Sequence, residues 1–292
     1  MPALTLEKIK RLAMIAMVSD DEFMERLVLK GGNLLDLVWG IGARSSMDLD
    51  FSIEDQFDEE HLDATKAKIE KVLKETFRGH GYEVFDLEFA VCPENVTGDM
   101  RSFWGGYRIE FKVIESDEFV RLASDRNRLR LSAADVGPGK RKRFMIDISK
   151  FEYCASKRAY DVEGFTVYGY TLEMVVCEKL RSICQQMPEY VAIVKRQATA
   201  RARDFFDIYC VLESSNIDLQ SPENLDLLGK IFAAKRVPLQ LLGKVQNYRE
   251  FHRPDFVAVA NTVKPSTKLK DFDFYFDYVV TICETLKSLW KE

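Results

Sequence analysis

The spacing of apolar residues changes near Tyr170, and this change constrains the fold more than any other feature of the sequence. Before it, short apolar or alternating runs separate helical patterns, which is typical of a mixed sheet covered by helices. After it, almost every pattern repeats at about 3.6 residues, the period of a helix. We therefore expect an α/β domain over residues 1–168 and an all-helical domain over residues 169–292, packed together as one body.

The same patterns predict individual elements. The expected strands lie at residues 27–30, 48–53, 82–91, 106–114 and 143–149. The expected helices lie at residues 4–18, from 22 onward, 34–40, 59–77, 117–130, 172–187, 201–213, 222–235, 238–247 and 272–290.

Composition and cysteine usage indicate a cytoplasmic protein. No apolar run approaches the roughly 18 to 20 residues that cross a bilayer, so no membrane partner is expected. Charges at Glu7, Lys8, Lys10 and Arg11 interrupt the N-terminal apolar positions and exclude a secretory signal. The six cysteines are scattered without a Cys-x-x-Cys pair, which favours buried reduced thiols over a zinc or redox centre.

Charge is distributed unevenly along a chain whose net charge is −5. The segment 48–60 is strongly acidic, whereas residues 121–143 and 195–203 are rich in Lys and Arg. One interpretation is an acidic metal centre between basic flanks that hold a polyanion. The other is a set of solvated helix faces.

Asp48 and Asp50 are the first candidate site residues. Residues two apart in a strand project from the same face, so the two carboxylates would lie side by side. Like charges this close need a cation between them, and oxygen ligands favour Mg²⁺ or Mn²⁺. A surface strand with alternating acids is the alternative.

The segment before this pair adds a second feature. Gly31 and Gly32 close an apolar run, and Asn33 can cap the helix that follows. Bare backbone at such a position lets a triphosphate approach. A simple strand-to-helix turn is the alternative.

Asp147 lies among large apolar residues at the centre of its predicted strand. Burying that carboxylate without a partner would be costly. A metal ion shared with Asp48 and Asp50 would be such a partner, and a salt bridge to Arg143 or Lys150 is the alternative.

Two later helices carry further charged residues. Lys179 lies in Glu178-Lys179-Leu180 on an otherwise apolar helix, from which it could meet a phosphate. Asp204 and Asp207 are three residues apart and therefore share a helix face. Ordinary ion pairs on helix surfaces are the alternative for each.

Taken together, these segments resemble the AbiEii/AbiGii family of toxin nucleotidyltransferases, which includes the MenT toxins. The resemblance spans residues 28–212. It rests on four segments: Lys30-Gly31-Gly32, Arg44-Ser45-Ser46-Met47-Asp48-Leu49-Asp50-Phe51, Glu178-Lys179-Leu180 and Arg203-Asp204-Phe205-Phe206-Asp207-Ile208-Tyr209. Asn33 departs from the family, which usually has Thr or Ser there, although an amide can donate the same hydrogen bond.

The resemblance implies a polymerase-beta-like nucleotidyltransferase fold and the transfer of a nucleoside monophosphate from an NTP to a hydroxyl. It implies that Asp48, Asp50 and Asp147 hold Mg²⁺ (or Mn²⁺), with Asp48, Asp50, Lys179 and Asp204 as the catalytic set. The nucleotide would contact Lys30, Gly31, Gly32, Asn33, Ser46 and Lys179.

In characterised relatives the acceptor is a tRNA 3′ end, and a winged-helix antitoxin can accompany the toxin. Two other hypotheses stay open. The acceptor could instead be a protein hydroxyl or a small molecule, or the chain could be a nucleotide-binding regulator without catalysis.

Overall fold

A seven-stranded mixed sheet forms the centre of the molecule, in the order β3-β4-β5-β2-β1-β7-β6. The computed structural model describes residues 4–96, 98–265 and 267–291. The strands are β1 (Val28–Lys30), β2 (Leu49–Ser52), β3 (Tyr82–Cys92), β4 (Gly106–Glu115), β5 (Phe144–Ser149), β6 (Arg158–Val162) and β7 (Phe165–Gly169). The expected α/β class is confirmed.

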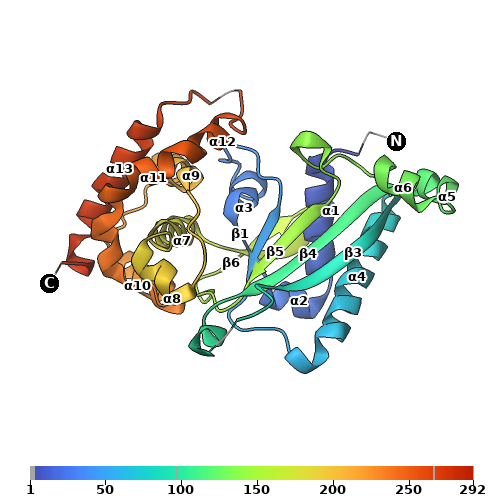
Figure 1. Cartoon of the computed structure of the whole chain (residues 1–292), viewed down its shortest axis with the longest axis horizontal. Coiled ribbons are helices and arrows are strands. Elements are labelled where there is room, and N and C mark those ends of the chain that lie inside the picture. The colour runs from blue at the N-terminus through green and yellow to red at the C-terminus, as the bar shows by residue number, and fades with distance from the viewer. Residues whose placement is uncertain (1–3, 97, 266, 292) are drawn as a thin grey trace.

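Helices of the N-terminal half cover one face of the sheet (Figure 1). They are α1 (Leu6–Val18), α2 (Asp21–Arg26) and α4 (Leu62–Gly79), with the 3-10 turn η1 (Glu59–His61) before α4. In α4 the buried residues Ile69, Leu73 and Phe77 recur every fourth position and form its apolar stripe. The short helix α3 (Gly31–Leu37) follows β1 and lies between the sheet and the C-terminal helices.

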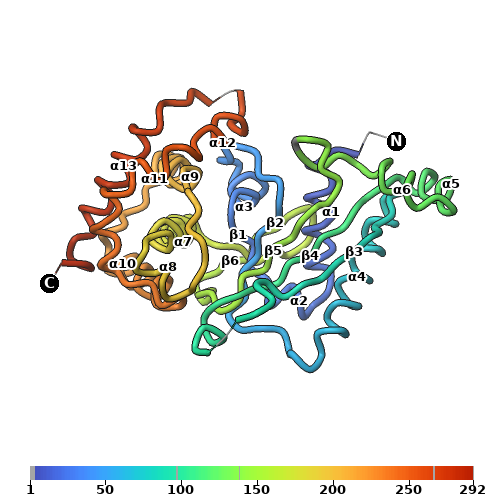
Figure 2. The backbone as a smooth tube through the Cα atoms, viewed as in Figure 1, coloured from blue at the N-terminus to red at the C-terminus, as the bar shows by residue number. Residues whose placement is uncertain are grey.

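The C-terminal half is helical, as expected, and its elements surround α7 (Figure 2). The α-helices are α7 (Leu172–Cys184), α8 (Pro188–Val194), α9 (Ala202–Glu213), α10 (Pro222–Ala234), α11 (Arg249–His252), α12 (Phe256–Ala260) and α13 (Phe272–Thr285), and the 3-10 segments are η4 (Leu239–Tyr248), η5 (Arg253–Asp255) and η6 (Lys287–Leu289). One continuous apolar cluster runs from α1 through the sheet to α13, so the two halves share a core.

Several boundaries differ from the sequence-based expectation. The β6–β7 hairpin was not expected, because its exposed and mixed residues lack a clean alternation. The helix expected at 117–130 is two helices, α5 (Ser116–Arg121) and α6 (Arg126–Ser132), because the Asp125 side chain caps a new start. Residues 238–247 form 3-10 turns, and the last long helix ends at Thr285 rather than at 290. The turns η2 (Gly98–Ser102) and η3 (Pro138–Lys140) complete the element order.

A C-terminal segment holds the loop that leads into β2. The backbone N–H of Ser45 donates to the carbonyl of Thr262 at 2.9 Å, and that of Lys264 donates to Ala43 at 2.9 Å. Arg44 and Val263 pair between them as an isolated antiparallel bridge. Residues beyond 213, to which the sequence assigned no role, therefore position the segment that carries Ser46 and Asp48.

All six cysteines are free thiols, and four of them are buried. Among the helices of the described residues, none is both long enough and apolar enough to span a membrane.

A buried ion pair joins the two halves of the chain. Arg181 of α7 contacts both carboxylate oxygens of Glu152, at 2.6 and 3.2 Å. Lys30 and Lys235 lie 3.6 Å from the same carboxylate. These cations hold the pKa of Glu152 well below its usual range, although burial alone would raise it.

We predict that Arg181→Ala lowers the free energy of unfolding by about 3–5 kcal/mol, because it leaves a buried carboxylate without its principal partner. Urea denaturation measures the loss. Arg121→Ala, which removes an exposed arginine paired with Glu118, is the control and should leave the urea midpoint unchanged. Equal midpoints for both variants would contradict a structural role for the buried pair.

Candidate active site

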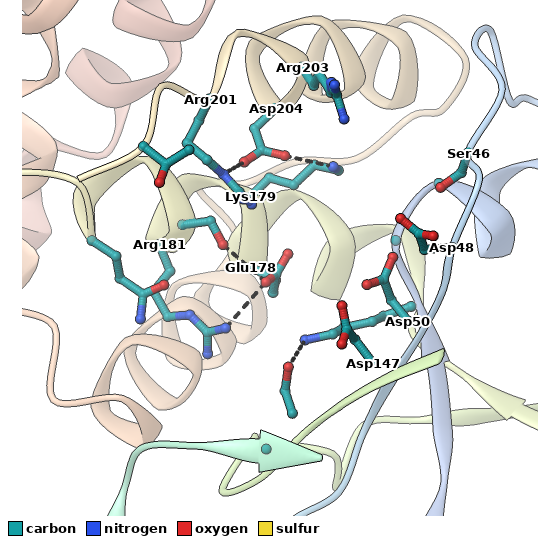
Figure 3. A pocket seen from close by; sticks show the side chains of 18 of the residues that line it. Ser46, Asp48, Asp50, Asp147, Glu178, Lys179, Arg181, Arg201, Arg203 and Asp204 are labelled. Carbon is teal, nitrogen blue, oxygen red and sulfur yellow. Dashed lines mark hydrogen bonds and ion pairs between the residues drawn. The ribbon is translucent and has the colours of Figure 1, made fainter. Parts of the chain in front are cut away.

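A cavity of about 740 Å³ lies between the edge of the sheet where β1 ends and helices α7 and α9 (Figure 3). Both halves of the chain line it. Nine of the candidate residues face it: Lys30, Gly31, Gly32, Ser46, Asp48, Asp50, Asp147, Lys179 and Asp204. Segments far apart in the sequence are thus gathered at one place.

Strand register places four charged residues in one row across the sheet. Lys30 of β1 is paired with Asp50 of β2, and Asp50 is paired with Asp147 of β5. Asp147 is in turn paired with Arg108 of β4. Side chains in register on neighbouring strands project from the same face, so the two carboxylates lie beside each other between two cations.

Asp48 enters the cavity from the bend just before β2, one residue outside the strand. Burial raises its pKa, and the Arg141 guanidinium, whose Nη2 lies 3.0 Å from Oδ1, opposes this effect. Burial also raises the pKa of Asp50 to about 6. Lys30 lowers it, whereas Asp147 and Asp48 add to the increase.

Two of the three site carboxylates are paired with arginines. Arg108 donates from Nε and Nη2 to the two oxygens of Asp147, at 2.8 and 3.2 Å, and Arg141 is paired with Asp48. The salt bridges that the sequence suggested for Asp147 are therefore wrong. Arg143 contacts Glu88 and Glu110 instead, and Lys150 donates to Gln56.

The three carboxylates suit a divalent cation by chemistry but are not assembled around one. Three carboxylates that supply oxygen donors on one cavity wall match the preference of Mg²⁺ or Mn²⁺. Within the described ranges, however, no three acidic, His or Cys side chains stand close enough to hold an ion. A cation at this place requires Arg141 and Arg108 to release Asp48 and Asp147.

The two glycines make room for the acidic residues. Gly31 has a φ of +72°, and a Cβ on it would lie 2.7 Å from Oδ2 of Asp50. A Cβ on Gly32 would lie 3.0 Å from the Cβ of Ser46. Because these glycines have no side chain, their backbone packs closely against Asp50 and Ser46. The same lack of a side chain lets a ligand approach the backbone from the cavity.

Asn33 does not take the place expected for it. Helix α3 begins at Gly31 rather than after Asn33, so Asn33 lies inside the first turn and is no cap. Its side chain is 0% exposed, lies outside the cavity lining, and donates from Nδ2 to the backbone carbonyl of Asp48 at 2.6 Å. It supports the bend that presents Asp48 instead of contacting the cavity.

Lys179 lies at the centre of a buried chain of alternating charges. Its Nζ donates to Asp204 at 3.0 Å and to Asp207 at 2.7 Å. Asp207 also accepts two bonds from Arg44, and Asp204 accepts one from Arg201. The alternative that Lys179 forms an ordinary ion pair on a helix surface is therefore wrong, since Lys179 is only 4% exposed.

The pKa values follow this arrangement. Burial alone would lower the pKa of Lys179, but Asp204 and Asp207 raise it above its usual value. Burial alone would raise the pKa of Asp204, but Arg201 and Lys179 lower it below its usual range. All members of the chain are thus charged at neutral pH.

The two basic stretches differ in position. Most basic side chains of 121–143 are paired with acids of their own surroundings, and none of the described residues from 121 to 143 lines the cavity. The pairs are Arg121–Glu118, Arg126–Asp86, Arg130–Asp86, Arg141–Asp48, Lys142–Asp135 and Arg143–Glu88. From the second stretch, Arg196, Arg201 and Arg203 do line it.

We predict that Gly31→Ala reduces activity and stability more than Gly40→Ala. Both glycines have a positive φ, so both variants suffer backbone strain of about 1 kcal/mol or more. Only Gly31 meets a site carboxylate, since a Cβ at Gly40 meets nothing within 4 Å. Thermal melting and pyrophosphate release measure the two effects. Equal losses would show that strain alone matters and that the contact with Asp50 does not.

A second prediction concerns His252, which is 1% exposed and accepts at Nδ1 from the N–H of Arg201 at 3.0 Å. Burial lowers its pKa from 6.5 to about 4. The unfolded chain therefore binds more protons between these values, and the free energy of unfolding should fall as the pH drops from about 6.5 to about 4.

His252→Asn retains an acceptor near Nδ1 but does not titrate there, so its unfolding should lose this part of the pH dependence. Urea denaturation across the same pH range provides the measurement. Parallel pH curves for the two proteins would contradict the assignment.

Comparison with known proteins finds a matching family. The model of the family described as "Nucleotidyl transferase AbiEii toxin, Type IV TA system" matches residues 13–278. No curated protein matches the chain.

Solved structures with similar folds include an H. pylori protein provisionally described as a nucleotidyltransferase, with 14% identity, a TM-score of 0.48, and 98% of this chain and 95% of that chain covered. JHP933 from Helicobacter pylori has 14% identity, a TM-score of 0.47, and coverage of 98% and 91%. An antigenic nucleotidyltransferase-like protein from Paracoccidioides brasiliensis has 14% identity, a TM-score of 0.35, and coverage of 78% and 93%. Because the family model covers most of its length, the chain belongs to the AbiEii family of nucleotidyltransferase toxins of type IV toxin–antitoxin systems.

Proposed function

We propose that this protein transfers a nucleoside monophosphate from an NTP to a hydroxyl at the 3′ end of an RNA, with tRNA as the leading acceptor. The oxygen of the hydroxyl attacks the α-phosphorus, the bond to the β-phosphate breaks, and pyrophosphate leaves. The observation that carries the proposal is the placement of Asp48, Asp50 and Asp147 on one cavity wall, with Lys179 facing the same cavity.

In this proposal Asp48, Asp50 and Asp147 hold Mg²⁺ or Mn²⁺. When bound, such ions neutralise the charge that develops on the attacking and leaving oxygens. The remaining steps belong to the chain itself. Asp50 or Asp147 accepts the proton of the attacking hydroxyl, because both carboxylates lie in the row that faces the cavity.

The triphosphate would lie at the end of the cavity formed by Gly31, Gly32, Ser46 and Lys179. Lys30 lies on the other side of Asp50 in the same row and adds positive charge. Asp204 positions Lys179, since it shares the ammonium group with Asp207. Asn33 is left out of the nucleotide contacts, because its amide is committed to the carbonyl of Asp48.

The division at residue 168 has a functional meaning in this proposal. Residues 1–168 supply the acidic residues and the glycines, and residues 169–292 supply Lys179 and Asp204. Such a toxin would act in the cytoplasm, where tRNA is available. A winged-helix protein would be its antitoxin, encoded beside it.

The experiment incubates the purified protein with each α-³²P-NTP, Mg²⁺ and a cell lysate. Label on RNA supports the proposal. Label on protein or on small molecules would move the acceptor to those classes, and the absence of pyrophosphate release with every NTP would identify a regulator without catalysis.

We predict that Asp48→Asn or Asp50→Asn lowers the rate of nucleotidyl transfer by at least about a hundredfold, because each removes a proposed ligand of the catalytic cation. Glu60→Gln removes one exposed carboxylate from the same acidic stretch and is the matched control. Circular dichroism confirms that each variant is folded. Near wild-type turnover in either Asp variant would refute the metal assignment.

A further inference from the structure

A second charged region occupies the end of the cavity away from Ser46. It is formed by the segment between α8 and α9, which contributes Arg196 and Arg201. Two bonds fix this segment: the N–H of Thr199 donates to Gln186 at 3.0 Å, and the N–H of Arg201 donates to His252 at 3.0 Å. The side chains are therefore presented to the cavity by an anchored backbone.

The guanidinium of Arg196 lies over an aromatic ring. Its guanidinium carbon is 4.9 Å from the centroid of Trp104, which also lines the cavity. Trp104 is itself held by an edge contact with Tyr190, at a centroid distance of 6.1 Å. A guanidinium over an indole is held by a cation–π contact and still has N–H groups for a planar or anionic partner.

Two acids that line the same cavity are already committed to other cations. Asp204 is shared by Lys179 and Arg201, and Glu152 is bound by Arg181. Within the described part of the chain Arg196 forms no ion pair, and its Nε is buried without a hydrogen-bond partner. Burial lowers the pKa of Arg196, and the charge of Arg201 lowers it further. A half-buried cation in this condition is relieved by an incoming anion.

The position of Trp104 indicates which anion this is. Trp104 precedes Gly105 and Gly106, where β4 begins, and β4 carries the Arg108 that contacts Asp147. In the proposed triphosphate position Ser46 lies away from this region, whereas Lys179 lies beside Arg201, because both are bonded to Asp204. Asp147 is a proposed acceptor of the proton of the attacking hydroxyl, so an anion on the β4 side of the cavity belongs to the acceptor strand rather than to the NTP.

We infer that Arg196, held over the ring of Trp104, binds a backbone phosphate of the acceptor RNA close to its reacting 3′ end. This inference rests on the proposed function and assigns its RNA contact to particular residues. It also replaces the stretch 121–143 as the RNA-binding element, because the cations there are largely neutralised by their own acids.

The test compares Arg196→Gln with Lys195→Gln. Lys195 is the neighbouring residue, is exposed and lies outside this cavity, so the two variants lose the same charge one residue apart. Filter binding of total tRNA across a salt series and steady-state transfer assays are the measurements. Arg196→Gln should raise the KM for tRNA about tenfold or more, leave kcat at saturating tRNA close to wild type, and reduce the salt slope by about one.

Two further variants test the geometry. Trp104→Leu should raise the KM for tRNA in the same direction, and Trp104→Phe should restore much of the affinity because a π face remains. Arg196→Lys should recover only part of it, since an ammonium lacks the planar fork. NTP affinity by calorimetry should be unchanged in all of them.

The outcomes separate this inference from the proposed function. If wild type labels RNA but Arg196→Gln and Lys195→Gln have equal KM values, the inference is wrong and the proposed function stands. If Arg196→Gln weakens NTP binding instead, the subsite belongs to the nucleotide and the inference is also wrong. If wild type labels no RNA, the proposed RNA acceptor fails and the inference fails with it.

Discussion

The pairing of two carboxylates side by side in the middle of a sheet is the constraint on which the rest of this structure depends. Asp50 and Asp147 are paired across β2 and β5, and each would be costly there without compensation. Lys30 and Arg108 close the row on its two sides. Burial and the nearby Asp147 and Asp48 raise the pKa of Asp50 even with Lys30 beside it, as is expected where a fold keeps an unfavourable charge for function.

The helical half of the chain supplies the partners of a second group of charged residues. Arg44 comes from the loop before β2, yet its partner Asp207 lies on α9, and Asp207 shares Lys179 with Asp204. The backbone pairing of Ala43 and Ser45 with residues 262–264 ties the same loop to the C-terminal region. The position of Ser46 and Asp48 is therefore set by both halves, and neither half alone could form the site.

Basic residues do cluster in two stretches of this sequence. Whether such a cluster is available to bind a ligand depends on neighbours that are distant in sequence. Asp86, at a bulge in β3, binds Lys112, Arg126 and Arg130, so much of the first basic stretch serves to anchor α6. The second stretch keeps Arg196 free of acids beside the cavity. A count of basic residues along the sequence cannot distinguish these two cases, because ion pairing is a property of the folded surface.

The sequence by itself determined the fold class, the change to helices after Tyr170, and the set of residues that would meet, because apolar periodicity and short glycine and acidic motifs are local signals. It also gave Asp147 two possible partners, a metal ion shared with Asp48 and Asp50 or a salt bridge, since a lone carboxylate in an apolar strand needs a partner. Only the tertiary structure decided which residues pair with these carboxylates. Strand register brought Arg108 to Asp147, and loop packing brought Arg141 to Asp48. The same packing keeps Asn33 out of the cavity, because the helix begins three residues earlier than expected and the Asn33 amide holds the carbonyl of Asp48.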